Sequence, residues 1–192
     1  MVNTIMDITG KEILWRGSYI QSVRISYKDR LGVERQWEAI ERIGCDGVVI
    51  VVPFTKDGKV VLIRQYRPAV NKSVVELPAG LIENGEEVIA ACRRELIEET
   101  GYVPDSISVL TEGIMSTGIN SEHWTALVAE GCEPAPASLT DTHKPDEAED
   151  IEVMLVEMDK VYDLLDEIHD RGDLVDIRIY GLIELAMRKL KR

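Results

Sequence analysis

A buried central strand is indicated by residues 47–54, which read Gly-Val-Val-Ile-Val-Val-Pro-Phe. This run contains no polar side chain, whereas a strand with one face in water alternates apolar and polar residues. A short run that is apolar throughout is typical of a strand buried on both of its faces. We therefore expect this segment to lie inside a sheet that is covered on both sides.

The segments around this run predict further strands and a few helices. Alternating or apolar patterns favour strands over residues 19–27, 36–42, 60–66, 107–114, 124–130 and 151–156, and amphipathic spacing favours helices over residues 88–100, 160–171 and 177–190. Residues 134–149 are polar and rich in Pro and Asp, and we expect a mobile loop there. This order predicts an α/β sandwich of mixed sheets, with a small antiparallel β element in front.

The charge balance restricts the class of partner. Lys and Arg number 22 and Asp and Glu number 35, so the net charge is −13. Such a chain repels nucleic acid and acidic membranes, and an anionic substrate would need a cation or a local basic cluster. No apolar run approaches the ~20 residues of a membrane span, and Cys45, Cys92 and Cys132 show no CxxC spacing. We therefore expect a cytoplasmic protein without disulfides, and neither nucleic acid nor a membrane among its partners.

Three glutamates fall on one face of the helix expected over residues 88–100. Glu95, Glu98 and Glu99 are spaced i, i+3, i+4 and span an arc of roughly 100°. Arg94 lies four residues before Glu98, but one arginine does not balance three carboxylates. Carboxylate oxygens are the ligands that Mg²⁺ and Mn²⁺ prefer, so the spacing favours a divalent-metal site. A solvated acidic helix face has the same spacing and is the simpler interpretation of a glutamate pair alone.

The wider pattern favours the metal site over the solvated face. The segment 80–102 matches G-x5-E-x7-R-E-U-x-E-E-x-G-U, where U is a bulky apolar residue, and Tyr102 is the one departure, an aromatic in an aliphatic position. Seven fixed positions at ~7% average usage give a chance match on the order of 10⁻⁸ per start position. This pattern resembles the box of the Nudix hydrolases. The resemblance implies a Nudix-type α/β/α sandwich in which Gly80 permits a tight loop.

The resemblance also implies the catalytic chemistry. Nudix hydrolases cleave a nucleoside diphosphate linked to another moiety, and they use Mg²⁺, with Mn²⁺ able to substitute. Carried over residue by residue, the resemblance implies metal ligation by Glu95, Glu99 and the carbonyl of Ala79. It implies that Glu98 holds a metal or its water shell, and that Arg94 orients the carboxylates through charge-assisted hydrogen bonds.

The residues that flank the box resemble the ADP-ribose pyrophosphatase branch. They lie at 37–42, 65–68, 76–83 and 116–122. This branch converts ADP-ribose to AMP and ribose 5-phosphate. Thr117 stands where the branch usually has a proline, which alters the stiffness of that loop. Another nucleoside diphosphate sugar, such as ADP-glucose or GDP-mannose, is therefore an alternative substrate. A non-catalytic nucleotide sensor is a further alternative, although every fixed box residue is present.

The same branch resemblance implies how the base is recognised. Trp37 is expected to stack on adenine, with Glu38 accepting a hydrogen bond from the adenine amino group. Tyr19 is expected on the opposite face of the base. The alternatives are an ordinary core aromatic at Trp37 and a cross-strand packing residue at Tyr19.

Four further residues are expected to contact the substrate or to act on water. Arg42 and Arg67 are interpreted as diphosphate contacts because guanidinium forks suit phosphate oxygens, and Leu81 is placed among the substrate-binding residues. Glu122 is interpreted as a loop carboxylate that contacts metal or acts as a general base. The alternatives are surface or strand-edge arginines and a solvated loop glutamate.

Two parts of the chain are distinguished at residue 45. Residues 1–45 are expected to form an N-terminal β element that is swapped in a homodimer, and residues 46–192 to form the Nudix hydrolase domain. The acidic segment 146–150 either closes over the metals or is simply solvated.

Overall fold

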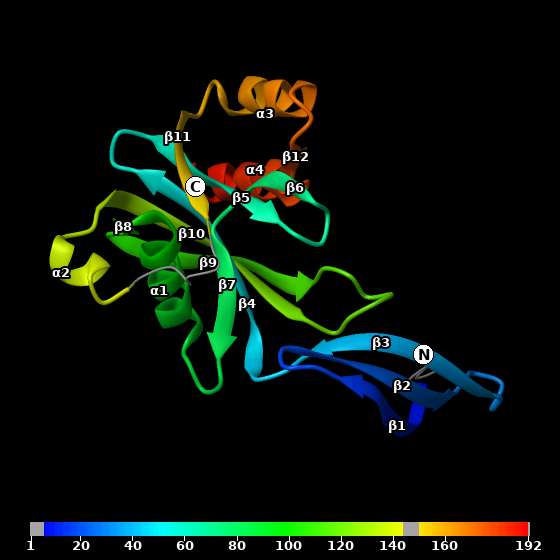
Figure 1. The fold of residues 1–192 in the computed structure, drawn as a ribbon. Helices are drawn as coiled ribbons and strands as arrows, with labels where there is room; N and C mark the ends of the chain where they lie inside the picture. Colours follow the sequence, from blue (N-terminus) through cyan, green and yellow to red (C-terminus); the bar gives the residue numbers. More distant parts are fainter. Residues whose placement is uncertain (1–5, 144–149, 192) are drawn as a thin grey trace.

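The protein folds into two β-sheets and four helices (Figure 1), as seen in a computed structural model that describes residues 6–143 and 150–191. The small sheet contains β1 (Asp7–Arg16), β2 (Ile20–Lys28) and β3 (Glu34–Arg42), paired antiparallel in that order. It lies at one end of the molecule, and the chain passes from it into β4 (Figure 1). None of the described helices is long and apolar enough to cross a bilayer.

The large sheet has nine strands, and its central path runs β12-β6-β5-β4-β10-β8. Off this path, β11 pairs with β5, β7 with β4, and β9 with β10; β4 and β10 are parallel neighbours. The strands are β4 (Cys45–Thr55), β5 (Lys59–Arg67), β6 (Lys72–Glu76), β7 (Ala79–Glu83), β8 (Tyr102–Val103), β9 (Ser106–Ile114), β10 (His123–Pro134), β11 (Ile151–Glu157) and β12 (Leu174–Val175). The helices are α1 (Val88–Thr100), α2 (Ala137–Thr140), α3 (Val161–Asp170) and α4 (Arg178–Leu190).

Strand β4 is buried on both faces, as its apolar run predicts. Ile50 and Val52 belong to one core cluster together with residues of α3 and α4. Val49 and Val51 point to the other side and pack in a second cluster with α1. Helices therefore cover both faces of the sheet, and the predicted α/β/α sandwich is confirmed.

Helix α1 has the predicted bounds and ends at Gly101, whose φ of 70° is the left-handed conformation that favours glycine. The helix packs on the sheet through Ala91, Cys92 and Leu96, which are fully buried, whereas Ile89 is 41% exposed.

The loop expected over residues 134–149 is wrong at its start. Strand β10 continues to Pro134 because it pairs with β8, and the nitrogen of Ala135 donates to the carbonyl of Gly101 at 2.8 Å. The short helix α2 follows. Residues 144–149, and with them all of the acidic segment 146–150 except Asp150, lie outside the described residues.

The small sheet contacts the large one through β3 and the loop after β9. The nitrogen of Ile40 donates to the carbonyl of Ile119 at 2.8 Å, and the indole nitrogen of Trp37 donates to the carbonyl of Gly118 at 3.3 Å. These bonds hold β3 beside the loop that contains Glu122.

Candidate active site

A cavity of about 970 Å³ lies where the small sheet, β7 and α1 meet the ends of the large sheet. Its lining is electrically balanced, although the whole chain carries −13. An anionic ligand therefore meets less repulsion here than over the rest of the surface. The charged lining residues are Arg42, Arg67, Arg94, Arg178, Glu76, Glu83, Glu95 and Glu98.

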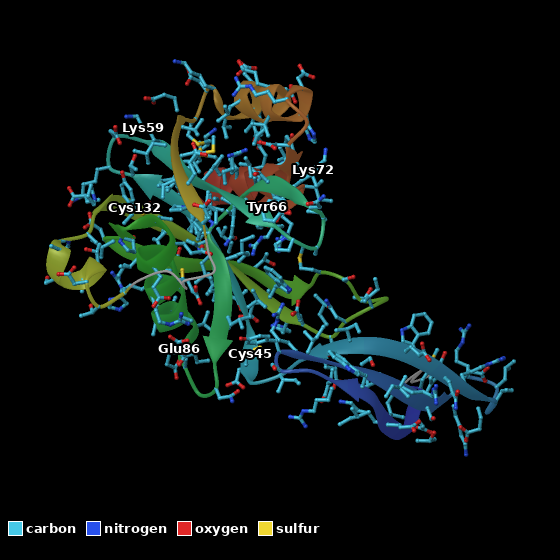
Figure 2. The ribbon with its side chains drawn as sticks, viewed as in Figure 1. Cys45, Lys59, Tyr66, Lys72, Glu86 and Cys132 are labelled. Carbon is cyan, nitrogen blue, oxygen red and sulfur yellow. The ribbon has the colours of Figure 1, made fainter. Side chains whose placement is uncertain are left out.

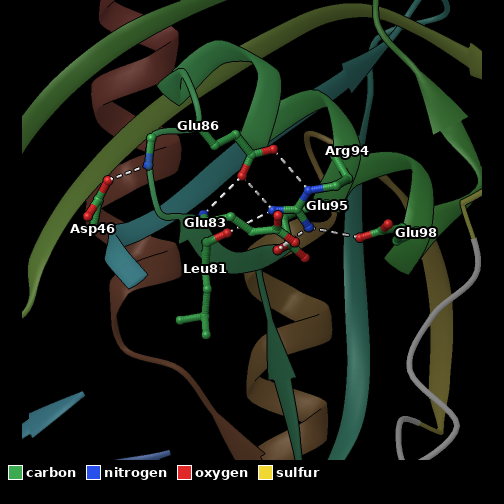
Figure 3. Close-up of polar contacts among 8 residues, drawn as sticks. Asp46, Leu81, Glu83, Glu86, Arg94, Glu95 and Glu98 are labelled. Atoms are coloured by element: carbon green, nitrogen blue, oxygen red, sulfur yellow. Dashed lines mark hydrogen bonds and ion pairs between the residues drawn. The ribbon is translucent and has the colours of Figure 1, made fainter. Parts of the chain in front are cut away.

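Arg94 donates hydrogen bonds to several acceptors on and beside the acidic helix face (Figure 3). Its Nη1 donates to Oε1 of Glu95 at 2.7 Å and to Oε2 of Glu98 at 3.0 Å. Its Nη2 donates to the carbonyl of Leu81 at 2.8 Å and to Oε2 of Glu86 at 2.9 Å, and Nε donates to Oε1 of Glu86 at 3.0 Å. The three carboxylates, Glu86 first, raise the pKa of Arg94. One guanidinium thus fixes two carboxylates of α1 and joins them to β7.

Glu86 holds the turn that precedes α1. Its Oε2 accepts a hydrogen bond from the nitrogen of Glu83 at 3.0 Å, and the ion pair with Arg94 lowers the pKa of Glu86. The nitrogen of Gly85 donates to Oδ2 of Asp46 at 2.7 Å, so the turn is also tied to β4 (Figure 3). The start of α1 is therefore anchored by side chains on both sides.

Gly80 does not permit a tight loop, contrary to the prediction. It lies in β7, and the residue of this segment with a left-handed φ is Gly85, at 78°. A Cβ on Gly80 would lie 1.9 Å from the carboxylate carbon of Glu95 and 2.1–2.2 Å from its oxygens. Gly80 is required because the carboxylate of Glu95 rests directly on this stretch of β7.

The third glutamate of the helix face is placed differently from the other two. Glu95 and Glu98 line the cavity, whereas Glu99 is 6% exposed and its Oε2 accepts a hydrogen bond from the nitrogen of Ala79 at 2.9 Å. That bond brings β7, whose Ala79 carbonyl is a predicted metal ligand, directly against α1. Metal ligation by Glu95, Glu99 and Ala79 stays a prediction.

The donor set fits a hard divalent cation by its chemistry. Glu95, Glu98 and the backbone of Ala79 present oxygen ligands within one cavity wall, and the missing Cβ of Gly80 gives the Glu95 carboxylate its place there. Within residues 6–143 and 150–191, no three His, Cys, Asp or Glu side chains are already arranged around a metal position. At α1, Nη1 of Arg94 bridges the carboxylates of Glu95 and Glu98 (Figure 3).

Arg42 and Glu122 are brought together from positions 80 residues apart. Nε of Arg42 donates to Oε1 of Glu122 at 2.6 Å, and the side chain of Glu122 is mostly buried. Arg42 lines the cavity. Glu122 is thus held by an arginine that lines the cavity, and its role at metal or water stays a prediction.

Arg67 also reaches the cavity as half of an ion pair. Its Nε donates to Oε2 of Glu76 at 2.7 Å. Burial raises the pKa of Glu76, and the charge of Arg67 opposes that rise. Glu76 was not predicted as a site residue, although a charged residue that ends an apolar strand is a usable signal.

The three residues expected at the base lie at the small sheet. Trp37 is 49% exposed, so it is not an ordinary core aromatic, and Tyr19 is 77% exposed and lines the cavity. Glu38 is exposed and pairs with Arg24 at 3.5 Å. Leu81 lines the cavity, with its carbonyl bound to Arg94.

Trp124 and Arg178 are two lining residues that sequence reasoning missed. Trp124 is the second residue of β10, and Arg178 is the first residue of α4. The usable signal was a lone arginine two residues after an aspartate, Asp176, at the start of an amphipathic helix.

Known proteins resemble this chain over most of its length. The family model of the NUDIX domain matches residues 46–175. An ADP-ribose pyrophosphatase of Saccharomyces cerevisiae is 32% identical over 174 residues, which cover 84% of this chain and 74% of that protein. An ADP-ribose pyrophosphatase of Bacillus subtilis is 33% identical over 140 residues, which cover 72% of this chain and 74% of that protein. A crystal structure of an ADP compounds hydrolase matches with a TM-score of 0.78 at 24% identity, covering 97% of this chain and 94% of that one, and this likeness concerns the fold.

Proposed function

The chain belongs to the Nudix family of hydrolases, and we propose that it hydrolyses the diphosphate of ADP-ribose to AMP and ribose 5-phosphate. The observation that carries this proposal is the set of hydrogen bonds by which Arg94 holds Glu95 and Glu98 in the wall of a charge-balanced cavity. Relatives from yeast and Bacillus subtilis that are named ADP-ribose pyrophosphatases support the choice of substrate.

Different residues of the cavity bind the diphosphate, accept a proton from water and position the carboxylates. Arg42 and Arg67 bind the diphosphate oxygens through their guanidinium groups. Glu122, already oriented by Arg42, takes a proton from the attacking water at a carboxylate oxygen. The water oxygen bonds to one phosphorus, and the bridging oxygen leaves with the other phosphate. Arg94 keeps Glu95 and Glu98 in place throughout.

A divalent cation belongs to this proposal, Mg²⁺ first and Mn²⁺ as its substitute. Glu95, Glu99 and the Ala79 carbonyl would hold it, with Glu98 beside them. When bound, the cation offsets the charge of the diphosphate and makes water a better nucleophile.

Base recognition is assigned to the small sheet. Trp37 stacks on adenine, Glu38 accepts from its amino group, and Tyr19 covers the other face. The exposure of both aromatic rings supports this assignment, because each has a face available to a ligand.

Hydrolysis is tested with ADP-ribose and Mg²⁺ by separating AMP and ribose 5-phosphate on a column. Glu98→Gln is expected to lower kcat by about 100-fold or more, because it removes a carboxylate from the metal-binding wall. Glu130→Gln is the matched control, an exposed glutamate on β10 outside the cavity. If turnover is unchanged in Glu98→Gln, the catalytic role proposed for the acidic face of α1 is wrong.

Another nucleotide sugar is the second candidate substrate, and Thr117 in the loop beside Trp37 is the observation that favours it. ADP-ribose, ADP-glucose and GDP-mannose are compared by kcat/KM under identical conditions. If GDP-mannose is turned over as fast as ADP-ribose, the assignment to ADP-ribose is wrong while the hydrolase reaction stands.

We also propose that residues 1–45 form a separate β element that is swapped in a homodimer, with residues 46–192 as the hydrolase domain. Exposed apolar side chains on the small sheet support this, among them Ile8, Ile13, Leu14 and Trp15. Light scattering at sub-micromolar concentration is expected to give about twice the chain mass of 21.6 kDa. A species of a single chain mass would contradict the dimer.

A further inference from the structure

The indole nitrogen of Trp124 is a buried donor without a hydrogen-bond partner in the described part of the chain. Buried donors are almost always paired, because an unmade hydrogen bond costs the full desolvation of the group. The ring of Trp124 lines the large cavity. A ligand that enters that cavity is therefore the natural source of the missing acceptor.

A second, smaller cavity borders the same ring but does not suit the indole N–H. It has a volume of about 280 Å³, and its lining is mainly apolar, with Ile50, Ala126 and Leu182 among its residues. An apolar lining offers few acceptors. The acceptor for Trp124 is therefore expected from the polar side, where the large cavity lies.

Arg178 stands beside Trp124 and is fixed in its orientation. Its guanidinium carbon lies 4.4 Å from the centre of the Trp124 ring, which is a cation–π distance. Its Nε donates to Oδ2 of Asp176 at 2.7 Å and to Oδ1 at 2.9 Å, and a further ion pair joins Nη2 to Oδ2. Arg178 is therefore held in place, and it lines both the large cavity and the smaller one.

These two side chains share a chemical property, because indole and guanidinium donate hydrogen bonds and accept none. We propose that Trp124 and Arg178 form a donor-only wall that binds the oxygens of the sugar phosphate released as the second product. This inference rests on the proposed function, and it assigns residues to the sugar-phosphate half of the substrate.

The neighbourhood of the wall agrees with a sugar phosphate. The Arg67–Glu76 ion pair also lines this part of the cavity, and the charges of Asp176 and Arg178 act on Glu76. A carboxylate beside donor groups accepts hydrogen bonds from sugar hydroxyls, while the donors bind hydroxyl and phosphate oxygens.

Nuclear magnetic resonance tests the contact directly, because the chain has three tryptophans and so three indole N–H signals. Trp124→Phe identifies the Trp124 signal by its loss and keeps an aromatic ring under Arg178. In the wild-type protein with Mg²⁺, ribose 5-phosphate is expected to shift that signal, whereas AMP shifts the signal of Trp37. A Trp124 signal that stays in place at saturating ribose 5-phosphate would overturn the proposal.

Arg178→Gln provides the second test, with Arg188→Gln, an exposed arginine on the same helix, as the matched control. Arg178→Gln is expected to weaken ribose 5-phosphate binding by about tenfold and AMP binding by less than about twofold. Equal losses for both ligands would indicate a merely structural residue and contradict the wall. If wild-type protein fails to hydrolyse ADP-ribose but binds ribose 5-phosphate through Arg178, the proposed function fails and the wall is supported.

Discussion

Replacing Gly80 with alanine is the sharpest perturbation that the structure offers. The added Cβ would lie 1.9 Å from the carboxylate carbon of Glu95. Non-bonded carbon atoms are comfortable at about 3.5–4.0 Å, so the carboxylate must retreat by at least about 1.5 Å. It can do so, because the obstacle is the end of a flexible side chain and the backbone of Gly80 is an ordinary strand.

The retreat is expected to affect catalysis far more than folding. A misplacement of about 1 Å can cost about 100-fold in rate, which corresponds to about 2.7 kcal/mol of activation free energy. Folding loses one partly buried charge-assisted hydrogen bond, between Arg94 and Glu95, worth about 1 kcal/mol in such a setting. That loss lowers Tm by about 2–4 °C in a chain of this size.

Steady-state hydrolysis of ADP-ribose and thermal unfolding measure the two effects separately. Gly113→Ala is the control, because Gly113 lies in strand β9 and a Cβ there meets nothing within 4 Å. The expected result is a kcat lowered by about 100-fold in Gly80→Ala and unchanged in Gly113→Ala. A Gly80→Ala enzyme with kcat within about twofold of wild type would refute the reasoning, because Glu95 would then work equally well away from β7.

The ion pair of Glu86 with Arg94 and the state of the thiols give two further predictions. Because Arg94 lowers the pKa of Glu86 below 4.5, the stabilisation is complete above that pH and lost as the pH falls through the lowered value. Urea unfolding of Glu86→Gln should therefore show a deficit of about 1–3 kcal/mol near neutral pH that shrinks as the pH falls through the lowered pKa of Glu86, and a deficit that grows in acid would contradict this sign. Burial raises the pKa of Cys92 and of Cys132 to about 12, whereas Cys45 is partly exposed at the junction of the two sheets (Figure 2). A thiol reagent at pH 8 should modify Cys45 alone until the protein is unfolded, and rapid modification of a second thiol would disprove it.

The elements that could be predicted are those whose signal is local. The bounds of α1 follow from its 3.6-residue period and from Gly101, and the burial of β4 follows from an unbroken apolar run. Strand β7 was not predicted, because the resemblance implied a tight loop at Gly80. Gly80 is instead selected by the approach of Glu95, which is a tertiary contact that no local pattern records.

In the candidate site, too, contacts within one helix could be predicted, whereas contacts between distant elements could not. The spacing of Arg94 and Glu98 on one helix predicted their pairing, which the structure contains. The bond from Arg94 to the carbonyl of Leu81 was not predictable, since it depends on how β7 lies against α1. Trp124 and Arg178 are 54 positions apart in sequence, and only the packing of α4 near the start of β10 brings them into contact.

The arginines of the cavity have lost most of their rotational freedom before any substrate arrives. Arg42 and Arg67 are each bound through Nε by a carboxylate, and Arg178 is bound by Asp176. Ordering a long side chain at the moment of association costs about 0.5–1.5 kcal/mol. Folding has already ordered these arginines. Binding of the substrate therefore does not have to supply that entropic cost again, and the cavity needs little rearrangement to bind it.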